Sequence, residues 1–224
     1  MPPVTGWDAS RHDRVIGHAA VEGSLAVEVE DVSAGGDALP DLLNETLWNL
    51  EWILSMQDPN DGGVYHKLTN KNFDGTVMPH QATSERYVVQ KTTAAALDFA
   101  AVMATASRVL AQYETQLPGM SAKMLAAAES AWDWAVANPG VTYKQPEDIK
   151  TGEYGDGNLA DEFAWAAAEL YITSKKDAYY TAMKPTETVA TVPSWGDVRG
   201  LGWISLAHHR ENLTAAADKT LIAN

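Results

Sequence analysis

Cysteine is absent from the 224 residues of this chain, which excludes disulfide bonds and thiolate-bound zinc. The sequence also lacks an unbroken run of about 18 apolar residues, the length that a membrane-spanning helix needs. Its first residues, MPPVTGWDASRHDR, do not show the basic and then apolar order of a signal peptide. We therefore expect no membrane partner and no export signal within this chain.

Basic residues are scarce relative to acidic ones, with 16 Lys and Arg against 30 Asp and Glu and a formal net charge of −14. Nucleic-acid binding needs clustered Lys and Arg to neutralise phosphates, so the composition argues against such a partner. An acidic chain suits a neutral ligand or a cation, although acidic surfaces also serve solubility alone. A hydrophobic content of 46%, with eight Trp and eight Tyr, indicates a globular chain with a sizeable core.

Sustained strand alternation is not found along the sequence, and the periodic segments have helical spacing. Residues 1–38 have an irregular composition, and the helical part is expected over 39–224. The expected helices, each bounded by turn residues or caps, cover 41–56, 92–113, 122–138 with Ser121 as its cap, 158–171, 177–183, a segment within 194–213 and a tail from about 214. The predicted fold class is all-α, with helices joined in antiparallel hairpins.

A stretch rich in acids and glycines, TGEYGDGNLADEFAWAAAELY, occupies residues 151–171. Its glycines permit turn conformations, and Asn158 is a good helix N-cap. Asp156, Asp161 and Glu162 bring three carboxylates to the junction of loop and helix. Such a junction can build a metal site or a sugar-binding wall. It can equally be a capped helix, because Asn158 followed by Asp161 resembles a capping box.

A polar loop covers residues 64–90, VYHKLTNKNFDGTVMPHQATSERYVVQ. Loops of this length inside compact domains are usually functional or mobile. Its side chains that can stack or form hydrogen bonds are Tyr65, His66, Lys67, His80, Arg86 and Tyr87. A lone His or Tyr in a loop is more often an ordinary surface or packing residue, so this loop by itself assigns no site.

Five segments in order resemble glycoside hydrolase family 9, the cellulase family with an (α/α)6-barrel catalytic domain. They are LPDLLNETLWNLEWILSMQDPNDGGVYHKLT, KTTAAALDFAAVMATASRV, AESAWDWAVANPGVTY, TGEYGDGNLADEFAWAAAELYITS and VPSWGDVRGLGWISLA, within residues 39–208. The string WNLEWIL followed by MQDPNDGGVYHK is the most specific part. The resemblance implies helical hairpins of an (α/α)6 barrel, here an incomplete one, with a substrate cleft at the end where the long loops gather.

The resemblance also implies a ligand and site residues. Tyr65 and His66 match a loop that lines the cleft, Tyr154 matches the region of a cleft-wall aromatic residue, and Trp195 is a further candidate for stacking on sugars. Asp161 and Glu162 resemble a calcium-binding pair, with Asp197 as a candidate third ligand, and hard oxygen ligands suit calcium. The implied partner is a β-glucan or cello-oligosaccharide, with no organic cofactor, in a secreted or periplasmic protein.

The catalytic motif departs from the family. The family's inverting reaction uses a base and an acid, two carboxylates about 6.5–9.5 Å apart, and the base belongs to a DAGD-type motif. Here the counterpart is GWDASR, in which Asp8 matches the first acid and Arg11 stands at the position of the base. A guanidinium cannot accept a proton near neutral pH. Glu211 follows a His-His-Arg string at the wrong place in the family's order and is not assigned the acid role.

Two functions follow as alternatives from these residues. One is an inverting β-1,4-glucan hydrolase domain, partial or degenerate, that lacks the full catalytic pair. The other is a noncatalytic carbohydrate-binding domain or an inactive helical fragment. In either case an incomplete helical ring leaves apolar helix faces exposed, and such faces promote self-association.

Overall fold

Helices dominate the computed structural model, which describes residues 39–223. The helices are α1 (Asp41–Leu54), α2 (Thr93–Leu110), α3 (Met120–Ala137), α4 (Ala160–Ser174), α5 (Asp177–Met183), α6 (Arg199–His208) and α7 (Lys219–Ala223). Within the described residues, short 3-10 turns lie at Pro79–Gln81, Ala111–Tyr113 and Arg210–Asn212. The strands in this part of the chain are the short β1 (Leu68–Thr69) and β2 (Tyr87–Val88), which pair antiparallel. The all-α prediction is confirmed.

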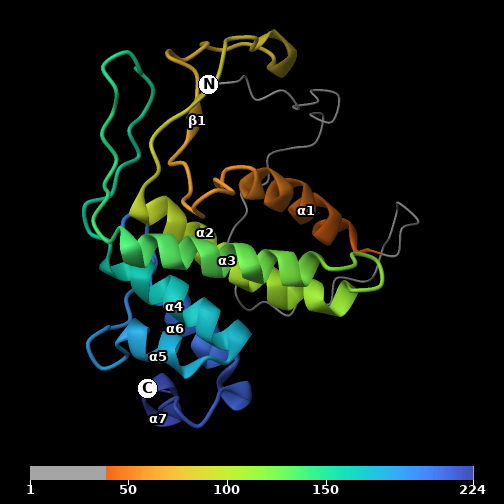
Figure 1. The fold of residues 1–224 in the computed structure, drawn as a ribbon, viewed down its shortest axis with the longest axis vertical. Helices are drawn as coiled ribbons and strands as arrows, with labels where there is room; N and C mark the ends of the chain where they lie inside the picture. The colour runs from red at the N-terminus through yellow and green to blue at the C-terminus, as the bar shows by residue number, and fades with distance from the viewer. Residues whose placement is uncertain (1–38, 224) are drawn as a thin grey trace.

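The helix α2 lies at the centre of the packing. It packs against α3 on one side and α4 on the other, and α4 in turn packs against α5 and α6 (Figure 1). Short connections, residues 111–119 between α2 and α3 and 175–176 between α4 and α5, turn the chain back along the preceding helix. The helices are therefore joined as hairpins.

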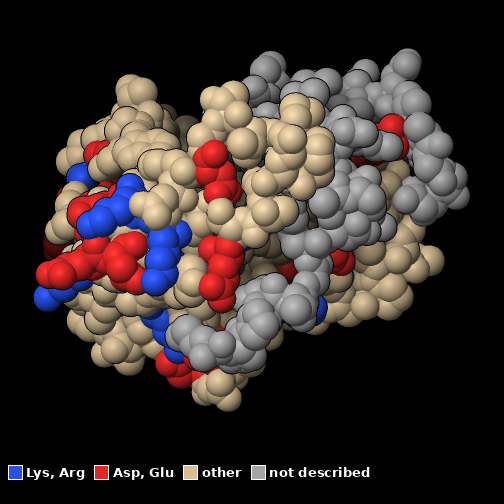
Figure 2. All heavy atoms as spheres, turned by 90° about the horizontal axis from the view of Figure 1, so that it is seen from above, with Lys and Arg blue, Asp and Glu red and all other residues tan. Residues whose placement is uncertain are grey.

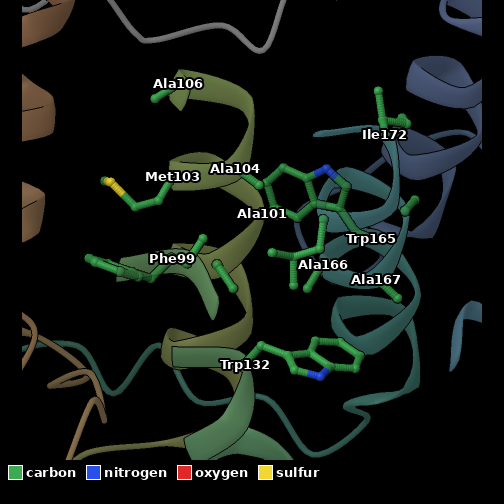
Figure 3. Packing of buried hydrophobic residues seen from close by; sticks show 14 of the residues in the cluster. Phe99, Ala101, Met103, Ala104, Ala106, Trp132, Trp165, Ala166, Ala167 and Ile172 are labelled. Atoms are coloured by element: carbon green, nitrogen blue, oxygen red, sulfur yellow. The ribbon is translucent and has the colours of Figure 1, made fainter. Parts of the chain in front are cut away.

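Small residues allow this close packing of helices. Ala96, Ala100 and Ala104 of α2 are completely buried, as are Ala166 and Ala167 of α4. Larger side chains fill the remaining space, and Figure 3 shows Trp165 of α4 extending toward α2 near Ala101 and Ala104. Truncating a fully buried side chain of this core, such as Leu97, to alanine is expected to cost about 2–5 kcal/mol of stability.

The stretch Thr93–Tyr113 has the length and apolar composition of a helix that could cross a membrane. More than half of its apolar window, 56%, is buried inside the protein, however. Its buried side chains face α3 and α4, so packing of the core accounts for its apolar character.

Several predicted boundaries differ from the structure. Helix α3 begins at Met120, after Gly119 in a left-handed conformation (φ 74°), and Ser121 is not its cap. The Ser121 hydroxyl instead donates to the Ser107 carbonyl, 2.8 Å away, and so joins α3 to α2. The expected helix within 194–213 begins only at Arg199, and the tail is helical only over Lys219–Ala223.

The polar loop forms an arm that begins and ends next to α2. Its strands β1 and β2 pair within it, and isolated bridges join Gln57 to Val64 and Tyr65 to Lys91 at its base. The arm extends away from the helices in Figure 1. These pairings hold the base of the loop, where His66 and Lys67 lie, beside the first residues of α2.

Candidate functional site

A cavity of about 490 Å³ lies where the N-terminal ends of α2, α4 and α6 converge. Its lining includes four acids, Asp98, Asp156, Asp161 and Glu162. The same lining also carries His66, Lys67, Tyr154 and Trp195. These side chains come from four segments that are distant in the sequence, and we call this cavity the acidic–aromatic cavity.

A second hollow of about 530 Å³ lies between the end of α1 and α3, and none of the predicted site residues lines it. The distribution of charged side chains over the described surface does not indicate a second candidate site either. On the face shown in Figure 2, the described Lys and Arg side chains lie among Asp and Glu side chains and do not form a separate basic patch. The acidic–aromatic cavity is therefore the candidate site.

The first turn of α4 supplies two buried carboxylates, Asp161 at 2% and Glu162 at 4% exposure. Asp161 Oδ2 accepts a hydrogen bond from the Val198 amide, 2.8 Å away, which ties α4 to the turn before α6. Within residues 39–223, Asp161 Oδ1, Glu162 Oε2 and Asp98 Oδ1 are buried without a hydrogen-bond partner. Leaving buried carboxylate oxygens without partners is costly, so this wall favours a bound proton or cation.

The pKa values of two of these acids also indicate that the cavity favours a bound proton or cation. Burial, together with the nearby Asp161 and Asp156 carboxylates, raises the pKa of Asp98 to about 7. Burial and the neighbouring Asp161 and Asp98 also raise the pKa of Glu162 well above its usual value. Both shifts arise because a buried site with several like charges disfavours the ionised carboxylate. The acidic wall can therefore hold protons near neutral pH.

His66 is a further lining residue of the cavity, and its ring is held by several contacts. Its ring stacks on Tyr143, with centroids 4.2 Å apart and an interplanar angle of 10°. Nε2 lies 3.0 Å from the Glu153 carbonyl oxygen, so it donates there, and Nδ1 lies 3.1 Å from the Thr92 hydroxyl. Burial lowers the pKa of His66. These contacts describe a neutral imidazole, with the Thr92 hydroxyl donating to Nδ1.

Two exposed rings stand at the rim of the cavity. Tyr154 is 59% and Trp195 89% exposed, and their centroids lie 6.3 Å apart with a tilt of 54°. Tyr154 has a φ of 55°, in the left-handed region that a residue with a side chain rarely adopts. Such rings can pack against the apolar faces of a ligand while the polar wall below takes its hydroxyl groups.

The structure brings together His66, Tyr154, Trp195, Asp161 and Glu162 from the predicted set and leaves two other described residues of that set, Tyr65 and Asp197, outside the cavity lining. The Tyr65 hydroxyl donates to Asp58 Oδ2 at 3.4 Å, with the Lys91 ammonium 5.5 Å from its ring centroid. Asp197 Oδ1 accepts from Arg199 Nε at 2.8 Å. Asp8 lies outside the described residues, as does Arg11.

The capping-box interpretation of residues 158–161 is wrong. Helix α4 begins at Ala160, and its N-cap residue is Leu159, which makes no side-chain cap bond. Asn158 Oδ1 makes only a long contact of 3.5 Å with the Ala160 amide. Asp161 bonds to Val198 instead of closing the box, so the acid at this position serves the cavity and the α4–α6 junction.

Sequence reasoning missed Asp98 and Tyr143. Asp98 is the one acid in the Ala-rich segment TAAALDFAAVMATAS, and an isolated acid on a buried helix was the signal that could have identified it. Tyr143 lies in an irregular segment, 142–149, whose path periodicity does not predict. Its stacking on His66 depends on tertiary structure alone.

Calcium binding depends on the oxygen donors that the cavity offers. Asp161 and Glu162 offer buried carboxylate oxygens without partners, which suits a hard cation. Among the described residues, however, no three acidic or histidine side chains are grouped so that they could hold one ion together. Asp197 Oδ1 is already bound to Arg199. The predicted pair fits a cation, and the described geometry does not include the third carboxylate with it.

The sequence matches the family model of Glycosyl hydrolase family 9 over residues 14–223. A xyloglucan-specific endo-beta-1,4-glucanase from Bacteroides ovatus is 50% identical over 171 residues, which cover 73% of this chain and 29% of that protein. Endoglucanase C from Cellulomonas fimi is 37% identical over 202 residues, covering 85% of this chain and 18% of that protein. The chain thus spans less than a third of the length of these relatives.

Solved structures agree in fold. A family 9 glycoside hydrolase structure from Bacteroides ovatus superposes with a TM-score of 0.76 at 45% identity, covering 83% of this chain and 35% of the other. The structure of AaCel9A in complex with a cellobiose-like isofagomine superposes with a TM-score of 0.72 at 29% identity. The match covers 82% of this chain and 35% of the other. The hairpins described above are accordingly part of an (α/α)6-barrel type of fold. On its sequence and its fold alike, this chain belongs to glycosyl hydrolase family 9.

Proposed function

We propose that the acidic–aromatic cavity binds a β-1,4-linked glucan, as the sugar-binding part of an endoglucanase site. The observation that carries this proposal is the exposed pair Tyr154 and Trp195 at the rim of a polar cavity. Apolar faces of pyranose rings pack against aromatic rings, and their hydroxyl groups need the polar partners that the cavity supplies. Support comes also from a family 9 relative whose structure holds a cellobiose-like molecule.

Xyloglucan fragments are the second ligand class to test. The relative that is 50% identical to this chain is named as specific for xyloglucan. Because Trp195 is 89% exposed, a glucan that packs on it keeps one edge open to solvent. Side branches on the glucan could occupy that open edge.

The proposal separates binding from turnover. Inverting hydrolysis needs a carboxylate base and a carboxylic acid about 6.5–9.5 Å apart. Arg11 stands where the resemblance places the base, and a guanidinium cannot take up the proton of the attacking water. We therefore expect this chain to bind glucan without hydrolysing it, with Asp8 as the one acid that matches the motif.

Two further expectations belong to the same proposal. Calcium is proposed as a structural ion held by Asp161 and Glu162, with backbone carbonyls or water completing its shell. Self-association through exposed helix faces is proposed because α1 leaves Leu42 64% and Trp52 40% exposed. Sedimentation velocity at increasing protein concentration tests it, and a monomer throughout would contradict it.

Titration calorimetry with cellohexaose and with a xyloglucan oligosaccharide tests the binding site. Tyr154→Ala and Trp195→Ala should each weaken binding roughly tenfold, the equivalent of about 1.4 kcal/mol. Phe73→Ala is the matched control, because Phe73 is also exposed (69%) but lies on the arm outside the cavity lining. Equal affinities for all four proteins would overturn the proposed site.

Turnover is measured separately as release of reducing sugar from carboxymethylcellulose by the purified chain. No release, with binding retained, is the expected result. Release that falls when Asp8 is replaced by Asn would show that the chain is an active hydrolase.

A further inference from the structure

The Lys67 ammonium makes an unusual set of contacts beside the cavity. Nζ donates to Gln145 Oε1 at 3.1 Å, to Thr151 Oγ1 at 3.3 Å and to the Gly152 carbonyl oxygen. An ammonium group carries three protons, so each has an acceptor. All three acceptors are uncharged, and two of them belong to the segment 151–152 that leads to the rim residue Tyr154.

Two aromatic rings face the same ammonium. Nζ lies 5.2 Å from the centroid of Tyr143 and 5.6 Å from that of Tyr154. Both distances are within the range at which a cation is attracted to the face of a ring. Tyr143 also stacks on His66. Lys67 therefore lies between the ring that supports His66 and a ring at the rim of the cavity.

Tyr154 needs such support, because its backbone conformation is disfavoured. Its φ is 55°, and a residue with a side chain keeps such an angle only where its surroundings fix it. The ring lies directly over Gly152, where an added Cβ would come within 2.6 Å of Tyr154 Cζ. The turn is held by Lys67 on the Gly152 carbonyl and by His66 on the Glu153 carbonyl.

We propose that Lys67 is a positioning residue of the glucan-binding site, which holds residues 151–154 in the turn that places Tyr154 at the rim. This inference rests on the proposed function. Lys67 acts through Tyr154: without the ammonium, the turn loses a hydrogen bond at Gly152 and the ring loses its cation. Tyr154 then leaves the left-handed conformation, and the rim loses one of its two rings.

The test compares Lys67→Met with Lys71→Met. Lys71 is a matched control because it also joins the arm to the segment before the site, through Asp148 at 2.8 Å, and lies 5.3 Å from the Tyr87 ring centroid. It does not line the cavity. Lys67→Met should weaken cellohexaose binding about tenfold in calorimetry and change the backbone NMR chemical shifts of residues 151–157, which report the conformation of the turn. Lys71→Met should change neither, and Lys67→Arg should restore part of the affinity.

A double-mutant cycle distinguishes positioning from general destabilisation. If Lys67 acts through Tyr154, Lys67→Met should cause no further loss of affinity once Tyr154 is alanine. A full tenfold loss in the Tyr154→Ala background would overturn the inference. Unchanged backbone chemical shifts of residues 151–157 in Lys67→Met would overturn it as well.

Failure of the proposed function gives a different result. A wild-type chain that binds neither cellohexaose nor a xyloglucan oligosaccharide would overturn the glucan site, and with it the role of Lys67 in binding. The backbone chemical shifts of residues 151–157 are measured without ligand. They would still show whether Lys67 holds the turn.

Discussion

Arg108 and Glu169 form an ion pair between α2 and α4, with Nη2 and Oε2 2.5 Å apart and the Glu169 side chain 2% exposed. Oε2 also accepts from the Thr105 hydroxyl at 3.0 Å, and Oε1 accepts from Trp165 Nε1 at 3.2 Å. Both oxygens of this buried carboxylate thus have partners. At the other end of the same two helices, Asp98, Asp161 and Glu162 each keep a buried oxygen without one. We infer from this contrast that Glu169 stabilises the fold, whereas the three acids with an unpartnered oxygen belong to the candidate site.

Glu169→Gln is expected to destabilise the protein by about 3 kcal/mol, because it leaves a partly buried guanidinium without its counter-charge. The free energy of unfolding in urea measures the loss. Glu129→Gln is the control, since Glu129 pairs with Lys176 at the surface. Such exposed pairs contribute roughly 0–1 kcal/mol. Equal losses for the two variants would contradict the structural role of the buried pair.

Asp98 predicts how stability depends on pH. Its pKa is about 7 in the folded chain, against an ordinary value of 3.8. Between these two values the folded state binds a proton that the unfolded state has released, so the free energy of unfolding falls as pH rises through this window. Above about pH 7 that loss is complete.

Asp98→Asn should remove part of this slope, because an amide does not titrate. The measurement is urea unfolding at intervals from pH 4 to pH 8 in the presence of a chelator, for the wild type and the variant. Asp74→Asn is the control, since Asp74 is exposed on the arm. An identical pH dependence in wild type and Asp98→Asn would show that Asp98 ionises normally.

Periodicity predicted the helices well, because their buried faces recur at helical spacing. It failed where a single contact decides the structure. Ser121 was predicted to cap α3, but its hydroxyl donates to Ser107 on α2. Asn158 was predicted to cap α4, but Asp161 bonds to Val198 and the helix begins two residues after Asn158. Caps depend on neighbours from other helices, and a local pattern does not contain them.

The residues alone indicated a possible site at Asp156, Asp161 and Glu162, but the family resemblance was needed to join these acids to the loop residues of the cavity. That resemblance named His66, Tyr154 and Trp195, which the structure places around one cavity. Composition and spacing could not do so, because these residues lie on loops far apart in the sequence. Asp98 was missed because an acid within an Ala-rich helix has no local signal of the partners it meets across the helix packing.

Calcium should raise the stability of the chain if Asp161 and Glu162 bind it. At a calcium concentration about 100 times the dissociation constant, binding to the folded state alone adds about 2.7 kcal/mol. The melting temperature with and without calcium measures the effect, and magnesium is the control ion. Asp161→Asn should abolish the increase. A melting temperature that is the same in calcium and in chelator would contradict the proposed ion.

The turn that follows α1 provides a test of close packing. Gly62 has a φ of 81°, and a Cβ there would lie 2.2 Å from Ser130 Oγ and 2.8 Å from the Ser130 carbonyl oxygen. Gly75 has a similar φ of 77°, with no atom within 4 Å of an added Cβ. Gly75→Ala should therefore cost only the backbone strain, about 1–2 kcal/mol.

Gly62→Ala should cost more than Gly75→Ala, because backbone atoms of α3 must also move away from the new methyl group. Urea unfolding of the two variants isolates this packing contribution, since the backbone strain is common to both. The movement should also reach Lys91, whose ammonium bonds to Asp58 and Asp61 in the same turn. If both variants lose the same free energy, the turn does not pack against α3 as closely as the structure shows.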